Sequence, residues 1–264
     1  SIGFRVTSFE KTKDGNILIG TIGGGVWKYN AKSINTISSV DGFPDGWSWH
    51  MICDNENNLW ASTNFGLMKV HGEKISKLYN KMGDFPSSSV NDVDLDNFGN
   101  IWAATPVGLI NMVGEKIIHY DRDDGFKNVN QSSLSINSRG KIWVSGDGFL
   151  SSFDGSEIKN FSSNVDSIRV FGANAGLLAL DNGDVLFGGV GLNLFSPGKD
   201  TNQFTRLAQS EWVNEITSDV DGNIIYSSVN EGLVKFKDGN KVNVYNTDNG
   251  FIFDSPMSVY VDAN

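Results

Sequence analysis

Short apolar segments separated by polar turns run through the whole chain in a recurring order. The turn Asp96–Asn100 precedes the apolar segment Ile101–Thr105, and a second turn closed by Gly108 leads into Leu109–Met112. Two short apolar segments joined by a turn that contains glycine are typical of a β-hairpin. No window of helical length has apolar residues at the 3.6-residue spacing of a helix, so we expect very little helix.

This hairpin recurs along the chain at a regular interval. The residues at the position of Trp102 are Leu18, Trp60, Trp102, Trp143, Leu186 and Ile225, and they lie 39 to 43 residues apart. An apolar segment such as Ser89–Leu95 precedes each hairpin, and a segment with alternating apolar and polar residues, such as Lys116–Tyr120, follows it. Each repeat therefore predicts four antiparallel strands. The period is that of propeller blades, whereas a β-sandwich needs no strict period and β-helix repeats are shorter.

We predict an all-β fold, namely a β-propeller of four-stranded antiparallel blades with six complete repeats plus the first strand of a seventh. The predicted blades span residues 5–46, 47–86, 87–128, 129–170, 171–210 and 211–252, and residues 253–264 start a further blade, all within a single domain, 1–264. The residues before the first strand are too few to complete that further blade. Because an open ring exposes unpaired strand edges, we expect the chain to be a fragment of a longer protein.

The composition of the chain argues against nucleic acid as a partner and against a membrane-spanning segment. The chain has 30 glycines and five prolines in 264 residues, which suits many tight turns, and its formal net charge is −10. The 21 Lys and Arg residues are scattered, so we expect no nucleic-acid binding. No apolar run reaches the length of a membrane-spanning helix. We interpret the single cysteine, Cys53, as a small apolar packing residue and not as a nucleophile.

The pattern Asp-x-x-Gly-x-Ile-Trp-Ala-x-Thr-x-x-Gly-Leu at Asp96–Leu109 resembles the two-component regulator propeller repeat. The segments that resemble the Asp-Gly-Leu-Pro loops between the blades of that family are Asp41–Pro44, Gly83–Pro86, Asp124–Phe126 and Asn249–Phe251. The resemblance covers essentially the whole chain. The chain departs from the pattern at Leu18, Leu186 and Ile225, and it lacks the Asp-Gly loop after the fourth and fifth blades.

The resemblance implies a role. Propellers of that family form the extracytoplasmic sensor of hybrid histidine kinases in Bacteroidetes, and many detect products of glycan breakdown. Two seven-bladed propellers there precede an immunoglobulin-like domain, a membrane helix and the kinase. The resemblance implies that this chain is periplasmic, that it binds a small-molecule or oligosaccharide ligand without itself being an enzyme, and that kinase activity lies outside it.

The ligand is expected on the face where the blade-joining loops meet the loops before each Gly-Leu pair. Aromatic rings beside amide and hydroxyl groups suit a sugar, since the ring covers its C–H face and the polar groups bind its hydroxyls. The candidate ligand-binding residues are Trp47, Trp49, His50, Asn91, Asn130, Gln131, Arg169, Trp212 and Glu215. Alternative roles are packing between blades for the tryptophans, an ion pair for Arg169 and a local hydrogen bond for His50.

We assign no catalytic residue, metal ligand or cofactor. His50, His71 and His119 have no metal-ligand spacing, and the chain has neither a Gly-x-Ser-x-Gly motif nor a convincing Cys–His pair. Two alternatives stay open. A propeller polysaccharide lyase or glycoside hydrolase needs acid–base groups that face inward, for which Asp92 and Glu215 are candidates. A protein-interaction platform recruits a partner or a second copy as a homodimer.

Overall fold

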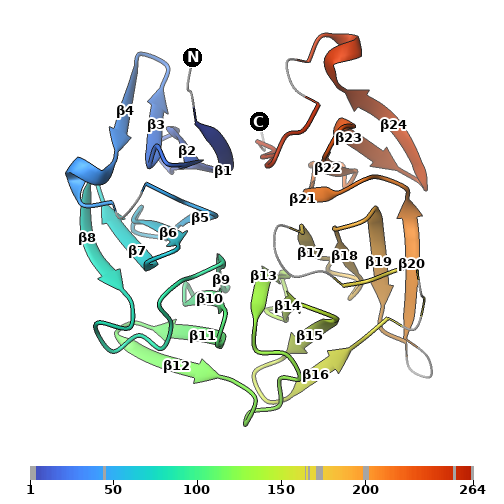
Figure 1. The fold of residues 1–264 in the computed structure, drawn as a ribbon, viewed down its shortest axis with the longest axis horizontal. Helices are drawn as coiled ribbons and strands as arrows, with labels where there is room; N and C mark the ends of the chain where they lie inside the picture. Colours follow the sequence, from blue (N-terminus) through green and yellow to red (C-terminus); the bar gives the residue numbers. More distant parts are fainter. Residues whose placement is uncertain are drawn as a thin grey trace. The chain divides into compact units, whose positions relative to one another are not determined.

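The computed structural model describes residues 4–43, 46–163, 165, 167–170, 175–198, 202–251 and 254–262. Pro44 of the first inter-blade loop, Asp166 of the fourth, and Phe253, Ala263 and Asn264 of the predicted further blade lie outside these residues. The described chain forms six antiparallel sheets of four strands, and in each sheet the strands are hydrogen-bonded in sequence order (Figure 1). We call each sheet a blade and number the blades 1 to 6 along the chain.

Two compact units divide the chain, and the first comprises Ser1–Asp124 with Val129–Gln131. It contains blades 1 to 3. Blade 1 has β1 (Arg5–Lys11), β2 (Ile17–Ile22), β3 (Val26–Asn30) and β4 (Ser33–Ile37); blade 2 has β5 (Met51–Cys53), β6 (Leu59–Thr63), β7 (Gly66–His71) and β8 (Lys74–Tyr79); blade 3 has β9 (Asp92–Leu95), β10 (Ile101–Thr105), β11 (Gly108–Val113) and β12 (Lys116–Tyr120). The first strands β1, β5 and β9 lie next to one another.

The second unit comprises Gly125–Asn128 and Ser132–Asn264 and contains blades 4 to 6. Blade 4 has β13 (Gln131–Ile136), β14 (Ile142–Gly146), β15 (Phe149–Phe153) and β16 (Ile158–Phe161); blade 5 has β17 (Leu177–Ala179), β18 (Val185–Phe187), β19 (Leu192–Ser196) and β20 (Gln203–Ala208); blade 6 has β21 (Val213–Ser218), β22 (Ile224–Ser228), β23 (Gly232–Lys237) and β24 (Asn240–Tyr245). Strand β17 packs against β21, so first strands again lie beside first strands.

The apolar residues of each hairpin pack between neighbouring blades. In the first unit, Trp60 of blade 2 is 5% exposed and packs in one cluster with Val93 and Ile110 of blade 3. In the second unit, Trp143 of blade 4 is fully buried and its ring meets that of Phe195 in blade 5 edge to face at 5.7 Å. The recurrent Trp position is therefore a packing position between blades, although Ile225 in blade 6 is only half-buried.

In every blade except blade 4, the glycine that closes the hairpin is required by close backbone approach; at Gly148 of blade 4 an added Cβ meets nothing within 4 Å. A Cβ atom added at Gly108 would lie 2.2 Å from the carbonyl oxygen of Tyr120, the last residue of β12, and one added at Gly66 would lie 2.1 Å from that of Tyr79. Gly108 also has φ +137°, a backbone conformation that other residues rarely adopt. The repeated glycine thus lets the fourth strand pair closely beside the hairpin.

In blades 2 and 3 the aspartate of the polar turn organises the turn and holds the packing tryptophan. The carboxylate of Asp96 accepts hydrogen bonds from the backbone N–H groups of Phe98 and Asn100 and from the Asn100 side chain. It also accepts one from the indole of Trp102. Asp54 makes the equivalent bonds in blade 2. The sequence motif is therefore structural.

The all-β prediction with four strands per blade is confirmed. The helices assigned in the described residues are the short 3-10 segments η1 (Ser39–Asp41) and η2 (Thr247–Asn249). No helix in the described part of the chain is long and apolar enough to cross a membrane. Residues 254–262 contain no strand, so the predicted start of a seventh blade is not confirmed. Strand β9 starts at Asp92, later than predicted, since the N–H of Val90 bonds to the carbonyl of Thr63 in blade 2.

Candidate functional site

Two tryptophans of the predicted site form a pair in the loop before β5. The rings of Trp47 and Trp49 meet edge to face, with centroids 5.4 Å apart and an interplanar angle of 77°. Both side chains are half-buried. Nε1 of Trp49 donates a hydrogen bond to Oδ1 of Asn64 over 2.9 Å, in the turn between β6 and β7. The blade-joining loop and the loop before Gly66 are therefore in direct contact.

His50 follows this pair and contacts the next blade. Its Nδ1 lies 2.5 Å from Oδ1 of Asp92, the first residue of β9, and 3.2 Å from the carbonyl oxygen of Val93. The His50 side chain is 35% exposed and that of Asp92 14%, so the pair reaches the surface. His50 and Asp92 lie one repeat apart, ten residues before Trp60 and Trp102, so they occupy equivalent positions in successive blades.

Glu10 lies close to His50 and was not anticipated from the sequence. Its Oε1 accepts the backbone N–H of Cys53 over 2.9 Å. Burial raises the pKa of Glu10, and this hydrogen bond and the charge of His50 offset part of that rise. Strand β1, the residue before β5 and strand β9 thus contribute a carboxyl, an imidazole and a second carboxyl within the first unit.

Asn91 and Gln131 also belong to the first unit and are joined to each other. The amide Nδ2 of Asn91 donates to the carbonyl oxygen of Gln131 over 2.7 Å. Gln131 is 1% exposed, whereas Asn130 beside it is exposed. The structure therefore buries one of these three candidates, leaves Asn91 half-buried and places Asn130 at the surface.

The remaining candidates, Arg169, Trp212 and Glu215, lie in the second unit. Arg169 is exposed before β17, and Trp212 is half-buried before β21. Glu215 is half-buried on β21, and its backbone N–H donates to Oγ of Ser227 over 3.1 Å.

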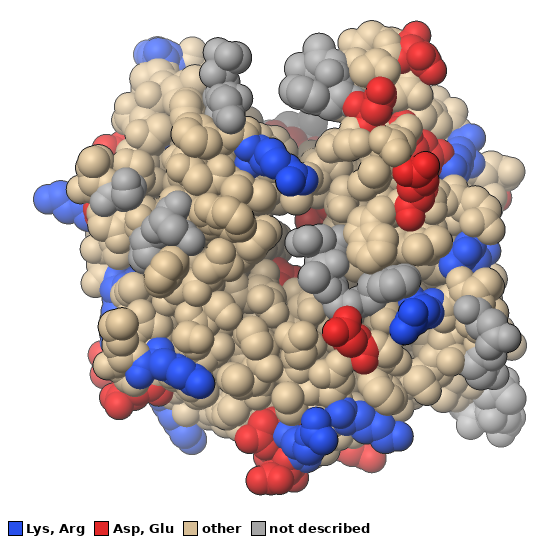
Figure 2. Space-filling view, in the orientation of Figure 1, with Lys and Arg blue, Asp and Glu red and all other residues tan. Residues whose placement is uncertain are grey.

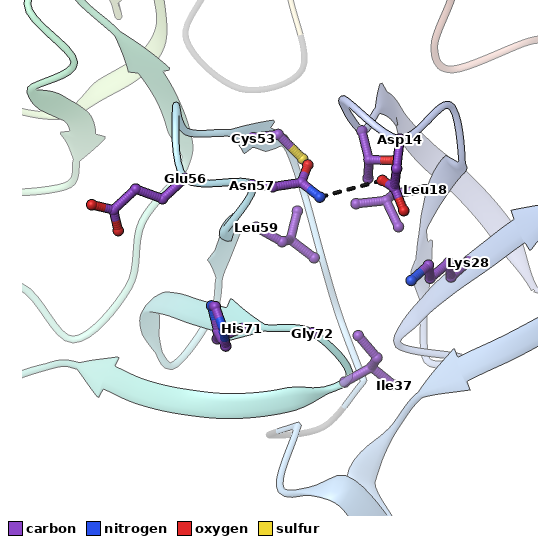
Figure 3. A pocket seen from close by; sticks show the side chains of 11 residues that line it. Asp14, Leu18, Lys28, Ile37, Cys53, Glu56, Asn57, Leu59, His71 and Gly72 are labelled. Atoms are coloured by element: carbon purple, nitrogen blue, oxygen red, sulfur yellow. Dashed lines mark hydrogen bonds between the residues drawn. The ribbon is translucent and has the colours of Figure 1, made fainter.

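A cavity that the sequence did not indicate lies between blades 1 and 2 (Figure 3). Its polar turns are at the opposite end of the strands from Trp47 and Trp49. Its volume is about 260 Å³. The lining residues are Thr12, Asp14, Leu18, Lys28, Ile37, Cys53, Glu56, Asn57, Leu59, His71 and Gly72. These residues come from separate turns and strands of two blades, so no contiguous motif marks the cavity.

The thiol of Cys53 in this cavity is held in its protonated form. Burial raises its pKa to about 12, and the negative charges of Glu10, Asp54 and Asp14 add to the rise. A protonated thiol is a poor nucleophile.

Among the described residues, no three or more His, Cys, Asp or Glu side chains gather closely enough to hold a metal ion. Charged side chains are scattered over the face in Figure 2, and the Lys and Arg residues described there form no continuous patch.

These features define the chain as a β-propeller built of Asp-turn hairpin repeats. No protein-family model and no curated protein matches the sequence. Solved structures do share its fold. One is the extracellular domain of a proposed one-component system, BT4673, from B. thetaiotaomicron, with 18% identity and a TM-score of 0.80 over 99% of this chain and 36% of that chain. Another is the extracellular domain of a proposed hybrid two-component system, BT3049, from the same organism, with 16% identity and a TM-score of 0.79 over 98% and 37%.

A lyase also has this fold. Virginiamycin B lyase from Staphylococcus aureus, solved as a catalytically inactive histidine-to-alanine variant with quinupristin, has 11% identity and a TM-score of 0.77 over 98% of this chain and 89% of that chain. The chain spans little more than a third of the length of the two sensor domains. At these identities the comparisons establish the fold, and they agree with the resemblance noted in the sequence.

Proposed function

We propose that this chain is the ligand-binding part of a periplasmic sensor of the two-component type. It binds a carbohydrate or a similar small ligand, and a kinase outside this chain receives the signal. The observation that carries the proposal is the fold shared with extracellular domains of proposed hybrid two-component systems along 98% of the chain.

The Trp47–Trp49 pair supports a sugar as the ligand. An edge-to-face pair leaves part of each half-buried ring accessible, and an aromatic face packs well against the C–H groups of a pyranose. Amide and imidazole groups for hydroxyl recognition lie nearby, on Asn64 and His50. Trp49 is fixed through its own indole N–H, so little conformational entropy is lost when a ligand packs on it.

A thermal-shift screen with plant, host and algal oligosaccharides tests the proposal. A ligand that binds only the folded state raises the melting temperature in proportion to its occupancy. We expect at least one fragment to raise it for the wild type and not for Trp49→Ala. Phe98→Ala is the control, because Phe98 is 90% exposed and lies in the polar turn at the other end of its blade. If no fragment shifts the wild type, the carbohydrate proposal is wrong. Light scattering on the same samples reports whether binding is accompanied by dimerisation.

The second candidate function is a lyase, favoured by the fold shared with virginiamycin B lyase and by the His50–Asp92 pair. A carboxylate on Nδ1 fixes the orientation of an imidazole and stabilises its protonated form, as a general base requires. Glu10, with a raised pKa, is the nearby group suited to act as an acid. Mass spectrometry of quinupristin and of the glycan panel after incubation separates the two functions. Turnover lost in His50→Ala would favour the lyase, and unchanged substrates favour the sensor.

A further inference from the structure

The cavity between blades 1 and 2 is closed on one side by a direct link between two polar turns. Nδ2 of Asn57 donates to Oδ1 of Asp14 over 3.3 Å, and the backbone N–H of Lys13 donates to Oδ1 of Asn57 over 3.1 Å (Figure 3). Nζ of Lys13 also reaches the carbonyl oxygen of Asn55. Asn57 has φ +63°, a conformation that asparagine tolerates better than most residues. The hydrogen-bonded turns of blades 1 and 2 therefore form one wall of the cavity.

The floor of the cavity is apolar. Leu18, Ile37 and Leu59 are each no more than 4% exposed and belong to the hydrophobic cluster between the two blades. The thiol of Cys53 adds a neutral, weakly polar surface, since its pKa of about 12 keeps it protonated. No Phe, Tyr or Trp is among the lining residues. Such a floor suits an aliphatic group.

The rim on the side of blade 1 carries adjacent charges of opposite sign. Asp14 and Lys28 both line the cavity on the side of blade 1 (Figure 3). The pKa of Asp14 is lowered by hydrogen bonds from Thr12 and Asn57, so the group is a carboxylate at neutral pH. Its oxygens also accept a bond from the Asn16 side chain, and the Asp14 side chain is exposed at the rim, so a cationic group can approach the carboxylate.

We propose that this cavity binds a small α-amino acid with an aliphatic side chain. The ammonium group of such a molecule pairs with Asp14, its carboxylate pairs with Lys28, and its side chain packs on Leu18, Ile37 and Leu59. The two charged groups of an amino acid are adjacent, as are the two charges of the rim. The volume of about 260 Å³ lies below the ~300–1,000 Å³ of sites for drug-sized ligands, and it suits a molecule of this size.

Calorimetric titration with three matched probes tests the site. L-leucine has both charged groups, 3-methylbutylamine lacks the carboxylate, and 4-methylpentanoate lacks the ammonium. We expect leucine to bind at least about tenfold more tightly than either analogue, since each lost group removes a charge-assisted hydrogen bond. The amine should bind better than the acid, because Glu56, Glu10 and Asp54 lie nearby and make the surroundings negative.

Two variants assign the charges separately. Lys28→Met should weaken leucine binding and leave 3-methylbutylamine unchanged, whereas Asp14→Asn should weaken leucine and leave 4-methylpentanoate unchanged. Lys28 is on the rim, so its variant keeps the proposal testable if Asp14→Asn perturbs the turn. As a control, Trp49→Ala should leave leucine binding unaltered, which separates this site from the proposed sensor face. Saturating leucine should also slow the reaction of Cys53, the sole cysteine, with an organomercurial.

Absence of leucine binding at millimolar concentration would overturn the proposal. An affinity for leucine that is unchanged in both Lys28→Met and Asp14→Asn would also overturn it. Binding that Trp49→Ala abolishes would place leucine at the other face, and it too would overturn the proposal. None of these results bears on whether glycans bind beside Trp49, so the two proposals fail independently.

Discussion

The indole N–H of Trp102 donates a hydrogen bond to a carboxylate oxygen of Asp96 over 3.0 Å, and Trp60 donates to Asp54 in the same way over 2.9 Å. One carboxylate thus joins the polar turn of a blade to the residue that packs in the hairpin. In blades 2 and 3 the aspartate and the tryptophan of the motif are therefore bonded to each other, which gives both positions a structural role. Function must then be sought where the repeats differ.

Removal of this carboxylate should destabilise the fold. Asp96→Ala leaves the Trp102 indole and the turn N–H groups without their acceptor, and hydrogen bonds to a charged group contribute about 1.5–3 kcal/mol each. We expect urea unfolding to show a loss of about 2–3 kcal/mol. Glu115→Gln, an exposed acidic position in the same blade, is the matched control and should cost less than about 0.5 kcal/mol. Equal effects in the two variants would show that the carboxylate does not hold the turn.

The same carboxylates should make stability depend on acid pH. Burial raises the pKa values of Asp54 and Asp96, but hydrogen bonds from Trp60 and Trp102 and from the turns outweigh it, so both pKa values are lowered. The stabilisation is complete above the unfolded value of about 3.9 and is lost as the pH falls through the lower folded values. Between pH 5 and pH 2 the advantage of the wild type over the Asp54→Asn/Asp96→Asn variant should shrink, as measured by urea unfolding. An advantage that stays constant over this range would contradict the assignment.

The close approach at Gly108 predicts a difference between two glycines of one blade. Both Gly108 and Gly114 have positive φ, so alanine is strained at either position. Only at Gly108 does the new Cβ also meet a backbone atom, the carbonyl oxygen of Tyr120 at 2.2 Å; at Gly114 it meets nothing within 4 Å. We expect Gly114→Ala to cost about 1–2 kcal/mol and Gly108→Ala clearly more. Thermal unfolding of both variants checks this, and similar melting temperatures would refute the packing argument.

The raised pKa of Cys53 predicts an unreactive thiol. Because its pKa is about 12, the rate of alkylation by iodoacetamide should keep rising about tenfold per pH unit from pH 7 to pH 10. A free thiol peptide with a pKa near 8.5 should level off above about pH 9. A plateau for the folded protein at the same pH as the peptide would mean that Cys53 is not shielded as described.

Much of the fold was accessible from the sequence, since each blade repeats the same local requirements. The sequence indicates a turn at Gly99, a packing residue at Trp102 and a close strand approach at Gly108. The spacing of these residues defines the blade. The start of β9 and the half-burial of Ile225 were not accessible, because both depend on contacts with other parts of the chain.

The site was accessible only in part. The sequence placed Trp47, Trp49 and His50 in one loop, but the bond from Trp49 to Asn64 depends on side-chain direction. His50 and Asp92 lie at equivalent positions of successive repeats, and this is the sequence feature from which their contact could have been predicted. The cavity beside Asp14 and Lys28 had no such signal, since two blades must pack before its wall exists.

The central claim is that the face with Trp47 and Trp49 binds a small ligand without transforming it. Its most direct test is calorimetric titration of the wild type and Trp49→Ala with the oligosaccharide that gives the largest thermal shift, followed by mass spectrometry of the recovered ligand. We predict saturable binding by the wild type, a loss of at least about tenfold in affinity for Trp49→Ala, and an unchanged ligand. Equal affinities for the two proteins, or a cleaved ligand, would contradict a binding role for this face.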